Sequence, residues 1–219
     1  MNTLRRHKYA ILLPTVLCVA LIDSFSPGLV LSDLAMTTTM LLVFLTVFER
    51  RADRLLAFIA LVTGTAAVAA HYVLPGSAQL PLRVINHSAK LLLIGLATFV
   101  ILRNILTQRV VGTDDLLGAV CGYLLAAGAW ASLFLLIESF SPGSFSESPG
   151  FNARLDTWDG RVAVLSNVSL GSLTSLGSSA AVAVRPPATI LVPLESLFGL
   201  FYIAVVVAQL IGARLSKEP

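Results

Sequence analysis

Long apolar runs alternate with short polar segments along this chain. A transmembrane helix needs about 20 predominantly apolar residues, and six runs approach or reach that length. They cover approximately Tyr9–Ile22, Leu29–Phe48, Leu55–Val73, Leu91–Ile105, Leu116–Ile137 and Ile190–Ala213. Segments rich in charge, glycine, proline or serine separate them, including a polar loop that we predict from Pro75 to His87. The pattern predicts an all-α membrane protein with six transmembrane helices.

A seventh apolar segment, from Val162 to about Val184, carries too many serine, threonine and asparagine side chains for an ordinary span. It lies between the fifth and sixth predicted spans, so it has to enter the membrane and return. Backbone that leaves the helical conformation at membrane depth is tolerated only where protein buries it or where it lines a water-filled cavity. We therefore predict a re-entrant half-helix followed by an extended return.

Composition supports this interpretation and narrows the function. Of 219 residues, 56% are hydrophobic and only 12% are charged, whereas a soluble protein carries about twice that charge. Six spans leave no room for a folded soluble domain, which excludes a large extramembrane enzyme and a nucleic-acid reader. The two cysteines, Cys18 and Cys121, lie singly in apolar runs, so neither a disulfide framework nor a metal-type cysteine pair is available. We expect no catalytic residues, no metal site and no cofactor.

Lysine and arginine gather in alternate loops, as the positive-inside rule requires of real spans. The side that holds both termini has roughly twice as many of them. Its members are Arg5, Arg6, Lys8, Arg50, Arg51, Arg54, Arg103, Arg109, Arg214 and Lys217. The other side has Arg83, Lys90, Arg154, Arg161 and Arg185. This asymmetry predicts that both termini are cytoplasmic.

The residues from Leu173 to Gly212 read LTSLGSSAAVAVRPPATILVPLESLFGLFYIAVVVAQLIG, and Val111 to Phe145 read VGTDDLLGAVCGYLLAAGAWASLFLLIESFSPGSF. They resemble the outer helix, pore loop and inner helix of bacterial six-span potassium channels with a two-pore-domain-like pore. That family typically reads LTTLGYGD in the loop, LE and then G in the inner helix, and VARLVG near its end. The rest of the chain matches the family only in the number and length of spans.

The resemblance implies a homotetramer in the bacterial inner membrane, with lipid and monovalent ions as its other partners. Residues 1–110 would form a four-helix N-terminal region and residues 111–219 a potassium-channel-like pore domain. The implied function is passive monovalent cation transport. The alternative is a non-conducting homologue that acts as a scaffold or as a silencing subunit. The fourth span, Leu91–Ile105, carries only Arg103, so it is not a functional voltage sensor, which needs a basic residue at every third position.

By the same resemblance, three groups of residues form the site. The filter-like pore lining is Ser175, Leu176, Gly177, Ser178 and Ser179. The pore helix and its support include Asn167, Thr174 and Glu195, and the inner-helix hinge includes Pro193 and Gly199. We expect Glu195 to accept a hydrogen bond behind the filter, from Asn167 or from a half-helix hydroxyl, with direct ion contact as the alternative.

The filter motif departs from the family at three positions. Ser178, Ser179 and Ala180 stand where the family has tyrosine, the second glycine and an acid, and only Gly177 is kept. A potassium filter replaces the hydration shell with rings of backbone carbonyls, which requires backbone conformations that glycine adopts freely. A left-handed non-glycine residue costs about 1–2 kcal/mol, so four copies of Ser179 would cost about 4–8 kcal/mol. Potassium selectivity is therefore doubtful, and the serine hydroxyls either line a pore or cap the half-helix.

Overall fold

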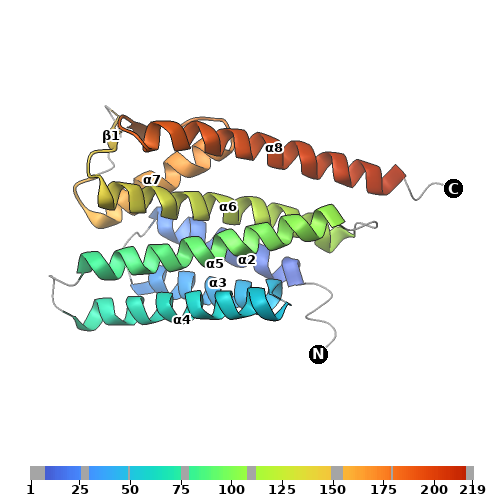
Figure 1. The fold of residues 1–219 in the computed structure, drawn as a ribbon, viewed down its shortest axis with the longest axis horizontal. Helices are drawn as coiled ribbons and strands as arrows, with labels where there is room; N and C mark the ends of the chain where they lie inside the picture. The colour runs from blue at the N-terminus through green and yellow to red at the C-terminus, as the bar shows by residue number, and fades with distance from the viewer. Residues whose placement is uncertain are drawn as a thin grey trace.

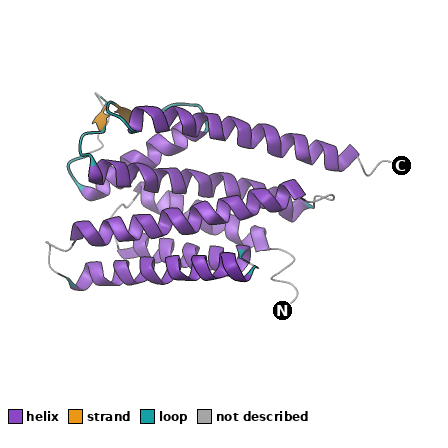
Figure 2. Ribbon diagram, in the orientation of Figure 1, coloured by secondary structure: helices purple, strands orange, loops and turns teal. Residues whose placement is uncertain are grey.

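The computed structural model describes residues 8–25, 30–48, 50–74, 79–107, 112–148, 155–178 and 180–215. These residues form seven helices and one two-stranded antiparallel sheet (Figures 1 and 2). The helices are α2 (Lys8–Phe25), α3 (Val30–Val47), α4 (Arg51–Val73), α5 (Gln79–Thr107), α6 (Thr113–Phe140), α7 (Trp158–Leu173) and α8 (Ala188–Leu215). The strands are β1 (Phe145–Glu147) and β2 (Ala181–Ala183).

The long helices run up and down the bundle in alternating directions, so that α2 begins and α8 ends at the same end (Figure 1). The two strands lie at the other end (Figure 2), which we call the sheet end. There α4 and α6 end, and α5, α7 and α8 begin (Figure 1). This alternation is the arrangement expected of helices that cross a membrane in sequence.

Four of the described helices are long and apolar enough to span a membrane: α4, α5, α6 and the Ala188–Gln209 part of α8. The apolar parts described for α2 and α3, Lys8–Val19 and Asp33–Val47, are shorter. The chain is thus a helical protein compatible with an integral membrane location. Six complete crossings remain a prediction.

Helix α5 differs from the sequence expectation at its start. The segment up to His87 was expected to be a polar loop, but within it residues from Gln79 onward are helical. Proline is tolerated in the first turn of a helix because the N–H it lacks has no helical partner there, and Pro81 occupies that turn. His87 and Ala89 are buried, so packing against neighbouring elements stabilises polar turns that hydropathy alone assigns to a loop.

Helix α6 lies at the centre of the molecule, and two of its glycines admit aromatic rings from other helices. A Cβ on Gly118 would lie 2.8 Å from the Tyr9 ring of α2, and one on Gly122 would lie 2.5 Å from the hydroxyl of Tyr202 in α8. That hydroxyl donates to the carbonyl oxygen of Ala119 at 2.9 Å. The main apolar core surrounds these contacts and joins α2–α6 to α8.

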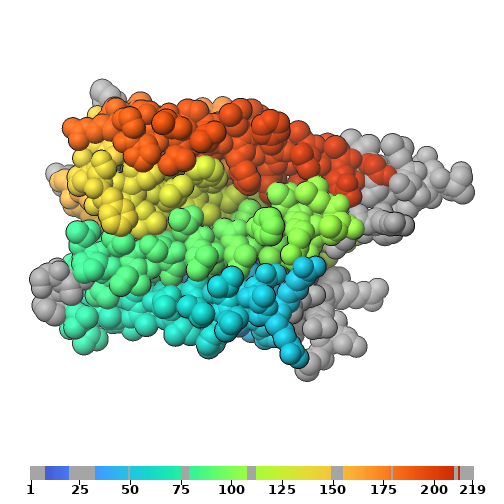
Figure 3. Space-filling view, in the orientation of Figure 1, coloured from blue at the N-terminus to red at the C-terminus, as the bar shows by residue number. Residues whose placement is uncertain are grey.

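Large apolar side chains also cover parts of the outer surface. Figure 3 shows α8, α6, α5 and α4 side by side on one face. Phe58 and Ile59 of α4, and Leu197 and Phe201 of α8, are among the exposed ones. Exposed apolar patches of this kind mark a membrane or protein contact, and lipid tails would cover them at no cost.

Candidate functional site

Helix α7 enters the bundle from the sheet end and stops partway along its neighbours. Thr157 caps its start by accepting a hydrogen bond from the Gly160 N–H at 3.2 Å. At its other end, the Tyr123 hydroxyl of α6 donates to the carbonyl oxygen of Leu173 at 2.8 Å. A Cβ on Gly199 of α8 would lie only 2.0 Å from that same oxygen. The end of α7 is therefore fixed against both long helices.

These contacts set the depth at which the chain turns back. At 1.5 Å rise per residue, Tyr123 lies roughly 25 Å along α6 from Phe140. By the same measure, Gly199 lies roughly 17 Å along α8 from Ala188. The hydrocarbon core of a bilayer is about 30 Å thick. The end of α7 thus lies between the two ends of both long helices, and a re-entrant position in a membrane stays a prediction.

The return segment, residues 174–178 and 180, leaves the helical conformation after Thr174, whose backbone is still right-handed helical. Thr174 hydrogen-bonds the carbonyl oxygen of Leu170 and ends the helix. Ser175 has φ +58° and Gly177 has φ +78°. The turn therefore contains two residues with left-handed backbone, and one of them, Ser175, is not a glycine. The Gly177 N–H donates to the carbonyl oxygen of Gly171 at 3.0 Å, which folds the segment back against α7.

Side chains at the tip of the return segment point outward from the chain. Ser175 and Gly177 are exposed, and Leu176 has 87% of its surface exposed. Two of the three residues are therefore polar or lack a side chain, and the third is a large apolar group without cover from its own chain.

Ser178 is used within its own chain. Its hydroxyl donates to Oδ1 of Asn167 at 2.9 Å and accepts the Ala180 N–H at 3.1 Å. Ser178 therefore satisfies one backbone N–H and the side chain of Asn167 within its own chain, whereas Ser175 is exposed. Ser179 lies outside the described residues.

After this point the chain returns to the sheet end. Ala180 is fully buried in a cluster with Phe134 and Phe145, so the position that aligns with the family's acid does not line an entrance here. β2 then pairs with β1, with Val182 opposite Ser146. Arg185 donates to the carbonyl oxygen of Pro142 at 3.4 Å.

Glu195 is completely buried behind α7. Its Oε1 lies 2.5 Å from the Ser169 hydroxyl, which also lies 2.8 Å from the carbonyl oxygen of Ala127. A hydroxyl has one proton and a carbonyl can only accept, so both contacts are hydrogen bonds at once only if the carboxyl supplies the second proton. A hydroxyl of α7 was one of the two donors expected here, although the sequence did not single out Ser169, and the other, Asn167, contacts Ser178 instead.

Pro193 and Gly199 lie in the first half of α8, but the structure gives them different settings. Pro193 is an exposed residue inside the helix. Gly199 is buried, at the closest approach of α8 to α7. Close packing explains why Gly199 has no side chain, and a hinge at either residue stays a prediction.

Three residues of this site were not identified from the sequence. Tyr123 and Ser169 supply the hydrogen bonds just described, and Gly171 allows the return segment to approach, because its Cβ would lie 2.4 Å from the carbonyl oxygen of Gly177. Glycine, serine and tyrosine inside apolar runs are common, so only their mutual placement distinguishes them. Comparisons of the chain with protein-family models, curated proteins and solved structures found no match.

Proposed function

We propose that this chain is one subunit of a pore-forming membrane protein with potassium-channel-like architecture. Four copies of α6, α7, the return segment and α8 surround one axis, and monovalent ions cross by diffusion. The observation that supports this best is the return segment, which exposes Ser175, Leu176 and Gly177. If α6 and α8 span the membrane, lipid would meet uncovered backbone there. Unsatisfied backbone groups in hydrocarbon cost several kcal/mol each. Neighbouring copies around a wet axis remove that cost.

Selectivity for potassium over sodium is not part of the proposal. Selectivity in such pores depends on rings of backbone carbonyls, and the glycine that would allow the second ring is replaced by Ser179. The proposed pore is therefore weakly selective among monovalent cations.

A second candidate is a non-conducting assembly that keeps the channel architecture as a scaffold or silences intact channel subunits. Leu176 favours it, because four exposed leucines at one axis would form an apolar constriction, and such constrictions close pores by dewetting. The hydroxyl of Ser178 favours it too, since its bonds to Asn167 and Ala180 take it away from an ion.

Cross-linking tests the assembly. In a chain carrying Cys18→Ala and Cys121→Ala, a Leu176→Cys variant should form covalent dimers under mild oxidation, because copies around one axis bring these tips together. Phe58→Cys on α4 is the matched control, since Phe58 is also exposed but lies on a helix that the proposal places away from the axis. Native mass spectrometry should show four copies. A lone monomer with no cross-link at position 176 would contradict the proposal.

Flux in liposomes separates the two candidates. The conducting candidate predicts potassium and sodium fluxes of similar size, and the non-conducting one predicts neither. Leu176→Ser should then raise or create flux if the apolar ring is the obstruction. Potassium flux well above sodium flux, blocked by barium, would contradict the weak selectivity proposed here.

Restoring the family filter is the complementary experiment. Ser178→Tyr with Ser179→Gly should introduce potassium selectivity if the surrounding architecture is that of a channel. Ala180 is best left unchanged, because an aspartate there would enter the buried cluster around Phe134. Unchanged sodium and potassium fluxes in a variant that still forms tetramers would argue against the channel architecture.

Both termini are proposed to be cytoplasmic. Arg50, Arg51 and Arg54 begin α4 at the end opposite the sheet, where Arg103 also lies. Positive charge favours the cytoplasmic side. Cysteines introduced at Thr3 and Ser216 should react with membrane-impermeant reagents only from that side. Reaction of either one from the outside would break the six-span topology.

A further inference from the structure

A polar cavity of about 130 Å³ lies at the sheet end, away from the return segment. Its walls come from the start of α3, the end of α4 and the starts of α5 and α7. An apolar cavity of about 150 Å³ holds the six carbon atoms of benzene, so this one encloses a group of about six non-hydrogen atoms at most, and its open side leaves room for a short substituent. The volume suits a small organic molecule rather than a peptide or a lipid tail.

Unpartnered polar atoms concentrate in this cavity. Among the described residues, five buried side-chain nitrogen or oxygen atoms have no hydrogen-bond partner, and four of them belong to residues that line it. They are His71 Nδ1, Arg83 Nε, Asn86 Oδ1 and His87 Nδ1. His87 is only 6% exposed. Buried polar groups are paired in more than about nine cases in ten, so four unpartnered atoms on residues around one cavity point to a hydrogen-bonding ligand. These atoms are closed off from solvent in the structure, so a ligand reaches them when their side chains rotate toward the cavity.

The four groups can all serve one kind of ligand atom. The Nε–H of Arg83 can only donate, and the Nδ1 of each histidine donates in one tautomer. The amide of Asn86 presents its NH₂ to the cavity after a flip that leaves its shape unchanged. An acceptor-rich ligand, such as a carboxylate, therefore satisfies the whole set, whereas a ligand that only donates leaves Arg83 without a partner.

Two cations and two acids line the cavity, so the preference for an anion depends on how the acids are engaged. The cations are Arg83 and Lys90. Asp33 already accepts the Tyr72 hydroxyl at 2.7 Å, and Asp159 is exposed at the start of α7. Charge-assisted hydrogen bonds between a guanidinium and a carboxylate are about twice as strong as neutral ones.

Trp158 supplies an apolar wall beside the cationic one. The Arg83 guanidinium carbon lies 4.7 Å from the centre of its ring, and the His87 ring centre lies 5.4 Å away. Val162, one turn further along α7, also lines the cavity. We propose that this cavity binds a small aromatic or aliphatic carboxylate, with its carboxylate at Arg83 and the two histidines and its apolar body against Trp158 and Val162.

Three probes of similar size test the chemistry by calorimetry on the detergent-solubilised full chain. Benzoate should bind at least about tenfold more tightly than its neutral isostere benzamide, and benzylammonium should bind more weakly than either. Benzoate should also raise the melting temperature, because a ligand that binds only the native state stabilises it. Equal binding of benzoate and benzamide, stronger binding of benzylammonium, or no benzoate binding up to roughly 50 mM would each overturn the proposal.

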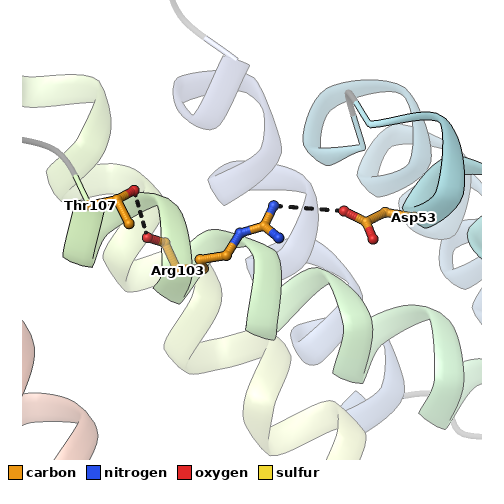
Figure 4. A network of polar contacts seen from close by, with 3 residues as sticks. All are labelled: Asp53, Arg103 and Thr107. Carbon is orange, nitrogen blue, oxygen red and sulfur yellow. Dashed lines mark hydrogen bonds and ion pairs between the residues drawn. The ribbon is translucent and has the colours of Figure 1, made fainter.

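Arginine variants on α5 locate the site. Arg83→Met should weaken benzoate binding at least about tenfold. Arg103→Met is the matched control, because Arg103 lies on the same helix, over the Phe99 ring and next to Asp53 at the far end (Figure 4). Arg103→Met should leave benzoate binding unchanged. Equal losses of benzoate affinity in the two variants would contradict the proposal that benzoate binds in this cavity. If Arg83→Met does not fold, the three-probe comparison on the unaltered chain still tests whether the protein prefers a carboxylate. No probe measurement depends on ion flux, so a non-conducting protein leaves this test intact.

Discussion

In α2–α5 most side-chain hydrogen bonds stay within one helix, whereas in α6–α8 several run from one helix to another. Thr39, Thr46 and Thr98 each donate to the carbonyl oxygen four residues back in their own helix. In the second region, by contrast, Tyr123 reaches from α6 to α7. Ser169 reaches from α7 to both of its neighbours.

The difference follows from what each region has to accommodate. Helices α2–α5 satisfy their own backbone, so apolar packing against α6 is enough to hold them. Helix α7 ends inside the bundle, so its last carbonyl oxygens and the return segment need partners at fixed places. The second region therefore relies on a few directional bonds and close backbone approaches, which a single substitution can remove.

The largest expected effect comes from Gly199. Gly199→Ala places a Cβ 2.0 Å from the carbonyl oxygen of Leu173, and backbone cannot move aside cheaply. We expect a loss of at least about 3 kcal/mol in the free energy of unfolding, at the upper end for overpacking. Denaturant titration in mild detergent measures it.

Gly95→Ala is the control for this substitution, because α5 leaves nothing within 4 Å of the added methyl group. Alanine is a better helix former than glycine by about 1 kcal/mol, so this variant should be as stable as the parent or slightly more stable. Similar losses in both variants would show that the two regions do not differ as described.

Ser169 and Glu195 should give the next largest effect. Ser169→Ala removes the partner of a completely buried carboxyl and should cost about 1–3 kcal/mol. Adding Glu195→Leu removes the stranded group, so the double variant should be less destabilised than the sum of the single ones. A double-mutant cycle by thermal unfolding measures this coupling, expected at about 0.5–3 kcal/mol. Strict additivity would mean that the two side chains act independently.

The order of the apolar helices could be predicted from the sequence because each one is a long apolar run. A shorter helix followed by a return could be predicted because polar residues interrupt the apolar run that contains it. The segment from Val162 to Val184 was expected to turn back, and α7, the turn at Ser175 and β2 divide it in that way. The start of α5 could not be predicted in this way. His87 is polar but is buried by neighbours that are distant in sequence.

The partners within the site were harder to predict for a related reason. Which hydroxyl of α7 meets Glu195 depends on how far α7 is shifted along its axis, because serines three residues apart lie on nearly the same face of the helix. Ser169 contacts Glu195, whereas Ser166 and Ser172 lie about one turn away on either side. Likewise, no sequence signal separates Tyr123 from other aromatic residues in apolar runs.

Tyrosine substitutions compare the two regions at a single hydroxyl. Tyr123→Phe leaves the carbonyl oxygen of Leu173 without its 2.8 Å donor at the end of α7, so we expect a loss of about 1 kcal/mol. Tyr72→Phe removes the 2.7 Å bond to Asp33, which lies at an exposed position where water replaces the hydroxyl. Its loss should be below about 0.5 kcal/mol. Thermal unfolding of both variants in one detergent provides the comparison, and the reverse order would contradict it.

The smallest effect is expected at the ion pair between α4 and α5. Arg103 and Asp53 approach to 3.7 Å (Figure 4), and both side chains keep about a quarter of their surface exposed. Partly solvated pairs of this kind contribute about 0–1 kcal/mol, and salt screens them further. Arg103→Met should therefore lower the unfolding free energy by less than about 1 kcal/mol, with the difference shrinking as sodium chloride is raised. Because α2–α5 are held mainly by apolar packing, the helices should stay together without this pair. A loss comparable to that of Ser169→Ala, unaffected by salt, would show that directional polar contacts hold this region as well.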